Sequence, residues 1–167
     1  MQLPFIAEWS TFLAVEAGAA ATLTGLVFVA VSLNLQKIMS FPGLPGRAGE
    51  SILQLLQIFF IATILLVPGQ PLRLLALEIL LIAAVSWAAQ VAGQIHYRRS
   101  AKDHPLSWVL FRAIFTQAAT LPFCIAGLGL LFGYGHLHAL YWIVPGVIFS
   151  FVGAVFSAWV LLIEILR

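Results

Sequence analysis

The chain has 167 residues, of which 62% are hydrophobic and only 8% are charged, and its mean hydropathy is +1.07. Such a composition cannot cover a globular surface with polar groups, so it excludes an ordinary water-soluble protein. The formal net charge of +2 is too small to indicate nucleic-acid binding.

Apolar segments of bilayer-crossing length follow one another along the chain. About 30 Å of hydrocarbon requires roughly 20 helical residues. We predict spans at about 11–36, 52–67, 72–94, 107–132 and 139–163. The brief turn Pro68-Gly69-Gln70-Pro71 makes the second and third spans antiparallel neighbours. We therefore expect an all-α bundle of five transmembrane helices, a single membrane domain over residues 1–167, packed around the first span.

Lysine and arginine residues sort to one side of this topology. The side that holds the C-terminus collects Lys37, Arg47, Arg98, Arg99, Lys102, Arg112 and Arg167. Only Arg73 falls on the other side. Because cytoplasmic loops hold the excess of positive charge, we predict an exterior N-terminus and a cytoplasmic C-terminus.

Two spans carry stripes of small residues. At about 100° per residue, four positions of the first span lie close to one line: Ala14, Gly18, Ala21 and Gly25. The fifth span repeats the spacing with Gly146, Ser150, Gly153 and Ser157. Such stripes let helix backbones approach closely. We interpret them as packing faces, either within the chain or between the subunits of a homo-oligomer.

Two carboxylates lie near the outer side of the predicted bundle, Glu16 in the first span and Glu78 in the third. A charge at mid-membrane costs about 2.5–3.5 kcal/mol, so each carboxylate requires a partner or water. In one interpretation, nearby Arg73 neutralises one of them. In the other, both carboxylates line an aqueous vestibule that attracts cations or relays protons.

Side-chain amides collect toward the predicted cytoplasmic side: Asn34, Gln54, Gln57, Gln90 and Gln117. We expect the amides of the second and third spans to meet through hydrogen bonds worth about 0.6–2 kcal/mol each. A hydrated inner vestibule is the alternative. Trp87, near the middle of the third span, requires either a partner for its indole N–H or a polar pocket to face.

Local motifs for catalysis are missing from the sequence. No nucleophile with a base, zinc-binding helix, phosphate loop or pair of catalytic carboxylates has the required spacing. His136 and His138 could hold a metal, but no cysteine or carboxylate stands beside them. We expect neither an enzyme nor a bound metal or cofactor.

The segments TLTGLVFVAVSLNL and FPGLPGRAGE resemble a loosely defined group of small bacterial multipass proteins of unknown function. The resemblance covers the first two spans and implies a bacterial inner-membrane setting. It supplies no catalytic or binding residues.

From the residues themselves we expect a small homo-oligomeric channel or transport-like pore for an ion or small solute. Glu16, Glu78 and Arg73 would set the electrostatics of its outer side, and the amides would supply its hydrogen-bonding walls. The alternative is a non-transporting interaction protein or an accessory subunit of a larger membrane complex. Membrane lipids are the expected surroundings in both cases, and nucleic acid is not an expected partner.

Overall fold

The computed structural model describes residues 4–40, 44–100, 106–133 and 136–166. The regular structure in these ranges is helical: α1 Pro4–Ala7, α2 Ser10–Leu33, α3 Leu35–Ser40, α4 Leu44–Leu66, α5 Leu72–Ser100, α6 Leu106–Phe132, α7 His136–Tyr141 and α8 Ile143–Leu166. Five helical segments are long and apolar enough to cross a membrane. The prediction of an all-α protein with five such helices is confirmed.

Several helix ends differ from the predicted spans. α4 begins at Leu44 rather than near residue 52, because Pro45 stands in its first turn, where a missing N–H breaks no helical bond. The first span ends at Leu33, and Asn34 separates α2 from the short α3. The fifth span starts as α7, breaks at Trp142 and continues as α8.

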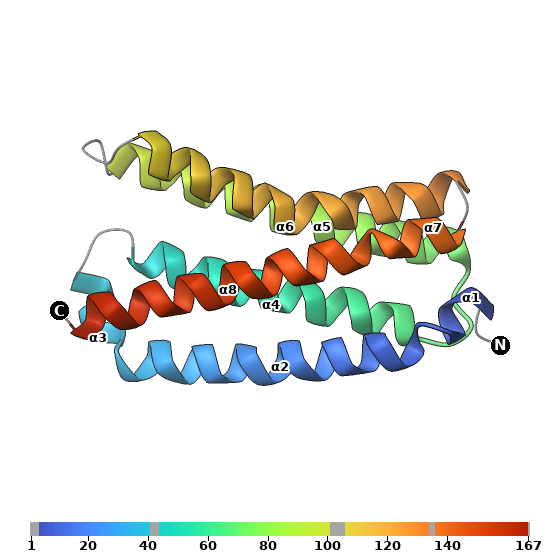
Figure 1. Cartoon of the computed structure of the whole chain (residues 1–167), viewed down its shortest axis with the longest axis horizontal. Helices are drawn as coiled ribbons and strands as arrows, with labels where there is room; N and C mark the ends of the chain where they lie inside the picture. The colour runs from blue at the N-terminus through green and yellow to red at the C-terminus, as the bar shows by residue number, and fades with distance from the viewer. Residues whose placement is uncertain (1–3, 41–43, 101–105, 134–135, 167) are drawn as a thin grey trace.

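Helices α4, α5, α6 and α8 form a closed ring, in which each helix packs against the next and α8 returns to α4 (Figure 1). α2 packs on α4 from outside this ring. In the apolar window of α4, 50% of the residues are buried, against 11% in α2. The expectation of a bundle packed around the first span is therefore wrong, because α4 and not α2 is the central helix.

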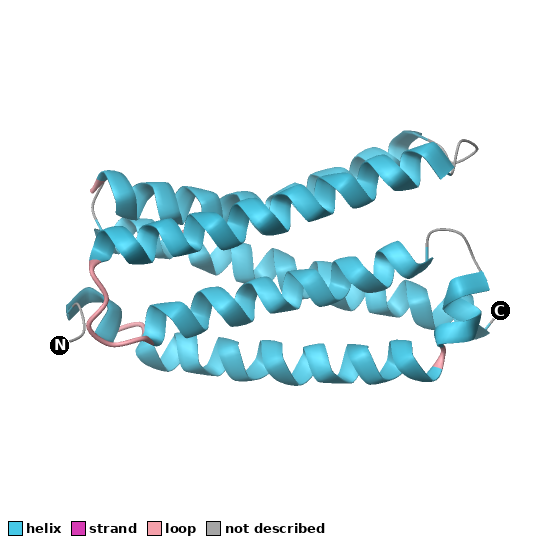
Figure 2. Ribbon diagram, turned by 180° about the vertical axis from the view of Figure 1, so that it is seen from behind, coloured by secondary structure: helices cyan, strands magenta, loops and turns pink. Residues whose placement is uncertain are grey.

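Successive long helices run in opposite directions, so the short elements gather at two ends of the bundle (Figure 2). α1, α7 and the α4–α5 turn lie at one end, and α3 lies at the other. The turn requires a glycine at Gly69, whose φ of +79° is costly for other residues. Lys37, Arg47 and Arg98 belong to the α3 end, whereas Arg73 lies at the other end.

The half of the ring interior toward α1 and α7 is filled by apolar side chains. This apolar layer consists of Ile58, Ile61, Ala62, Leu65, Leu75, Ala76, Ile79, Ala83, Phe123, Ala126, Leu130, Leu140, Ile143 and Val147. Phe123 is 0% exposed and packs so closely on Gly146 that a Cβ there would lie 2.9 Å from the ring. The layer closes this end of the ring.

Candidate functional site

Polar side chains replace apolar ones in the ring interior next to the apolar layer. Eight of them are only 0–4% exposed: Ser51, Gln54, Gln57, Ser86, Gln90, Thr116, Thr120 and Ser150. We call this group the polar cluster. Glu50, 8% exposed, lies at its edge nearest α3.

Helical spacing explains why these residues share the interior. Gln54 and Gln57 lie three positions apart on α4, and Ser86 and Gln90 lie four apart on α5. Residues at these spacings fall on one face of a helix. Each helix of the ring therefore turns its polar face toward the same interior.

The packing of α4 on α5 sets the positions of Gln54 and Gln90 along the axis of the bundle. Glu50 Oε1 lies 3.7 Å from the position of a Cβ on Gly93. Gln54 lies one turn after Glu50 on α4, and Gln90 lies about one turn before Gly93 on α5. Because the two helices are antiparallel, Gln54 and Gln90 lie at the same level. The two amide groups thus occupy one layer of the ring.

On its other side α4 packs against α8 at Gly153. A Cβ at Gly153 would lie 2.7 Å from Gln54 Oε1, so the missing side chain makes room for the Gln54 amide. By the same antiparallel register, Gln57 lies level with Ser150. The polar cluster is therefore about two helical turns deep.

Two hydrogen bonds connect the cluster across helices. Gln90 Nε2 donates to Thr120 Oγ1 at 2.9 Å, which joins α5 to α6. The Ser150 hydroxyl donates to the carbonyl oxygen of Ala119 at 3.3 Å, which joins α8 to α6. The predicted bonding between amides of the second and third spans is wrong for the described residues, since Gln90 bonds to α6 instead.

The glutamines of the cluster retain unpartnered atoms. Gln54 Oε1, Gln57 Oε1, Gln57 Nε2 and Gln90 Oε1 are completely buried and have no hydrogen-bond partner. Each such group costs about 1–3 kcal/mol. Native proteins keep few of them, and a bound water, ion or ligand is a common explanation.

The small-residue stripe of α8 packs inside the chain. Gly146 receives the Phe123 ring, Gly153 receives the Gln54 amide, and Ser150 is fully buried. Ser157 is half-buried. Gly146, Ser150 and Gly153 thus pack against other helices of the same chain.

The small-residue stripe of α2 behaves differently. Its members Ala14, Gly18, Ala21 and Gly25 are all exposed. A Cβ on Gly18 or Gly25 would meet no atom within 4 Å. This face of α2 has no partner within the described part of the chain.

The outer residues predicted to act together are not joined. Gln70 Nε2 donates to Glu78 Oε2 at 3.0 Å, so the α4–α5 turn supplies the partner of this carboxylate. Glu16 is half-buried and Arg73 is exposed. Among the described residues, no hydrogen bond or ion pair links Arg73 to either carboxylate, so neutralisation by Arg73 stays a prediction.

Two predicted pathway amides lie outside the polar cluster. Asn34 Nδ2 donates to the carbonyl of Ala30 in its own helix at 2.9 Å. Gln117 accepts a 2.7 Å hydrogen bond from the indole Nε1 of Trp87. The expected partner of Trp87 is thus found, and Gln117 serves the α5–α6 contact rather than the ring interior.

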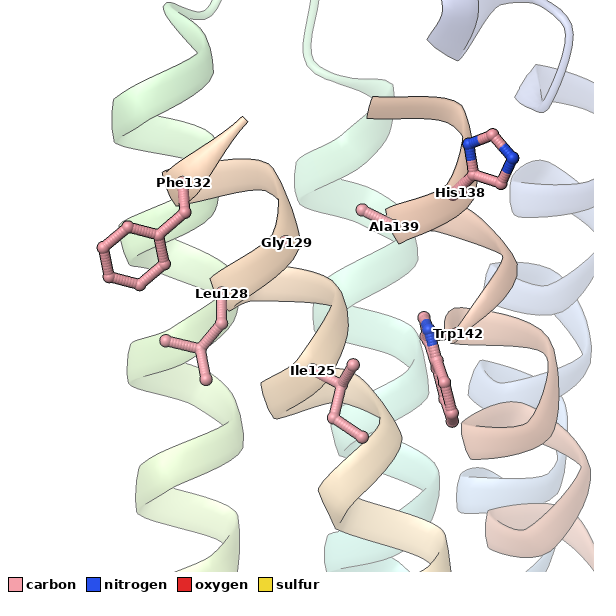
Figure 3. A pocket seen from close by; sticks show the side chains of 7 residues that line it. All are labelled: Ile125, Leu128, Gly129, Phe132, His138, Ala139 and Trp142. Atoms are coloured by element: carbon pink, nitrogen blue, oxygen red, sulfur yellow. The ribbon is translucent and has the colours of Figure 1, made fainter. Parts of the chain in front are cut away.

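Two apolar grooves lie elsewhere. One of about 350 Å³ is lined by Ile125, Leu128, Gly129, Phe132, His138, Ala139 and Trp142 (Figure 3). One of about 300 Å³ lies between α2, α4 and α8, lined by Leu23, Val27, Leu55, Ala154, Val155, Ala158 and Trp159. Within the described ranges, no three His, Cys, Asp or Glu side chains gather into a metal-binding group.

Sequence reasoning missed part of the cluster. Ser51 and Thr116 are not among the predicted pathway residues, and Ser150 belongs only to the predicted packing stripe. The four-residue spacing of Thr116 and Thr120 is a signal that could have placed both on the inner face of α6.

Comparison with protein-family models, curated proteins and solved structures found no match to this chain.

Proposed function

We propose that this protein is a membrane channel or transport-like pore that moves an ion or small polar solute through the ring of α4, α5, α6 and α8. The observation that carries the proposal is the set of buried glutamine atoms without partners. Polar groups inside a membrane bundle are costly and mark substrate or ion pathways. A solute that forms hydrogen bonds or ion contacts with these atoms would remove the free-energy penalty of leaving them buried without partners.

A purely structural role explains the glutamines less well. Amides that hold helices together do so by bonding across the interface. Gln57 leaves both its Oε1 and its Nε2 unpartnered, so its amide contributes no such bond. A buried amide with both polar atoms unpartnered is suited to bind a ligand.

The solute would enter from the α3 end, where Glu50 lies at the edge of the polar cluster. Toward α1 and α7 the apolar layer closes the path, so passage requires this layer to part. By the distribution of positive charge, the α3 end is cytoplasmic and the N-terminus exterior. We place the protein in a bacterial inner membrane on the resemblance of its first two spans.

Flux into proteoliposomes tests the proposal. Vesicles that contain the full chain are expected to pass a small ion or solute faster than empty vesicles, and the Gln117→Leu variant is expected to match the unmodified protein. Gln117 is the matched control because its amide bonds to Trp87 outside the cluster. Equal flux in loaded and empty vesicles, across alkali cations, chloride, urea and glycerol, would remove the proposal.

The exposed stripe of α2 supports assembly as a homo-oligomer. Gly18→Leu with Gly25→Leu is expected to convert the oligomer to monomers without unfolding the chain, because no atom lies within 4 Å of either added Cβ. Native mass measurement in detergent checks this result. Ala30→Leu adds similar bulk on another exposed face of α2 and should leave the mass unchanged. A monomeric unmodified protein would contradict the assembly.

The exposure of α2 also favours the second candidate, an interaction protein or accessory subunit that docks another membrane protein. In that case the α2 variants would lose a partner of different sequence, and loaded vesicles would show no flux.

A further inference from the structure

We infer that the polar cluster is a binding site for a small monovalent cation, held by the side-chain oxygens of Gln54, Gln57 and Gln90. The inference rests on the proposed function, since it names the class of solute that uses the ring. It follows from the kind, the placement and the packing of the unpartnered atoms.

The unpartnered atoms favour a cation by their kind. The cluster offers three acceptor oxygens, Gln54 Oε1, Gln57 Oε1 and Gln90 Oε1, against one donor, Gln57 Nε2. A further unpartnered donor, Gln94 Nε2, lies one turn beyond Gln90 toward α3. Glu50 adds a carboxylate at the same edge and is buried, 8% exposed. Amide and carboxylate oxygens are ligands that hard cations prefer.

The placement of the three glutamines also brings them to neighbouring levels of one ring. Gln54 and Gln90 lie in the same layer of the ring by the α4–α5 register that the contact of Glu50 with Gly93 indicates. Gln57 lies one turn from Gln54 on the same face of α4. Thr120 Oγ1, bonded to Gln90 Nε2 at 2.9 Å, fixes the direction of the Gln90 amide.

The packing favours a small ligand. The three oxygens are completely buried, so a ligand that reaches them must shed its hydration shell and bond to them directly. A dehydrated Na⁺ or Li⁺ is smaller than water and can sit directly among side-chain oxygens, which replace its hydration shell. A neutral solute of several heavy atoms requires a preformed cavity beside the amides.

Salt-dependent thermal unfolding tests the inference. The full chain in detergent is heated in LiCl, NaCl, KCl or N-methylglucamine chloride at equal ionic strength. We expect LiCl or NaCl to raise the Tm by roughly 3–5 °C at ten times the dissociation constant, relative to the bulky organic cation. Gln57→Leu should remove this shift, while Gln117→Leu should retain it.

Gln54→Asn provides a second variant, which keeps an amide but withdraws its oxygen by one methylene. We expect this variant to need an ion concentration at least about tenfold higher to reach the same rise in Tm. Equal Tm values in all four salts would overturn the inference, and so would an unchanged shift in both cluster variants. A second outcome separates the two proposals: the Tm is the same in all four salts, but the protein passes urea or glycerol and Gln57→Leu loses this flux. In that case the cation inference fails and the proposed function stands. If no flux is found either, both fail.

Discussion

Replacing Gln57 by leucine is expected to raise the free energy of unfolding by about 1–3 kcal/mol. Both polar atoms of its amide are buried without partners, so an apolar side chain of similar size removes a cost and breaks no bond. Gln57 is 1% exposed, and it adjoins the apolar layer through Ile58 and Ile61 on the same helix. Unfolding of the variant in mixed detergent, compared with the unmodified protein, measures the difference.

Gln117→Leu is the matched control and is expected to change stability in the opposite direction. It removes the 2.7 Å hydrogen bond from Trp87 Nε1, which should lower the free energy of unfolding by about 0.5–1.5 kcal/mol. A loss of stability in Gln57→Leu similar to that in Gln117→Leu would mean that the Gln57 amide bonds across helices after all.

Phe123→Ala is expected to produce the largest loss of stability, about 3–5 kcal/mol. The ring is 0% exposed and lies at the boundary between the apolar layer and the polar cluster. Its removal also shortens the barrier between the cluster and the α1 end. Reconstituted Phe123→Ala is therefore expected to leak solute faster than the unmodified protein, in a flux assay at a temperature where it stays folded.

Two further substitutions control for nonspecific effects of the Phe123 change. Phe132→Ala removes the same side chain from a 67% exposed position on α6 and should change stability by no more than about 0.5 kcal/mol. Gly146→Ala alone should destabilise by about 1–3 kcal/mol, because its Cβ would lie 2.9 Å from the Phe123 ring. In the Phe123→Ala background that penalty should vanish. An additive double variant would contradict the described contact.

Hydropathy predicted the helices well because crossing a bilayer imposes length and composition directly. It could not predict which helix is central. In lipid, an exposed apolar side chain costs little, so α2, with 11% of its window buried, and α4, with 50%, look alike in sequence. The early start of α4 does not follow from hydropathy, because Pro45 and Gly46 are poor helix formers, whereas proline is compatible with a first helical turn.

The candidate site was predictable only in part, for a related reason. The spacing of Gln54, Gln57 and Gln90 indicates the inward faces of α4 and α5. The sequence does not show how helices distant along the chain pair, so the α8 contact with Gln54 and the bond from Gln90 to Thr120 were missed. The same limit led us to group Glu16, Glu78 and Arg73, although Gln70 is the partner that Glu78 has.

We propose that the buried glutamines bind a solute rather than hold helices together. This proposal is tested most directly by measuring solute flux and unfolding of Gln57→Leu in the same lipid preparation as the unmodified protein. We expect Gln57→Leu to be more stable than the unmodified protein and to pass the solute at least about tenfold more slowly. A loss of about 1.4 kcal/mol in solute binding at the barrier gives that factor. A variant that is less stable and transports as before would contradict the proposal.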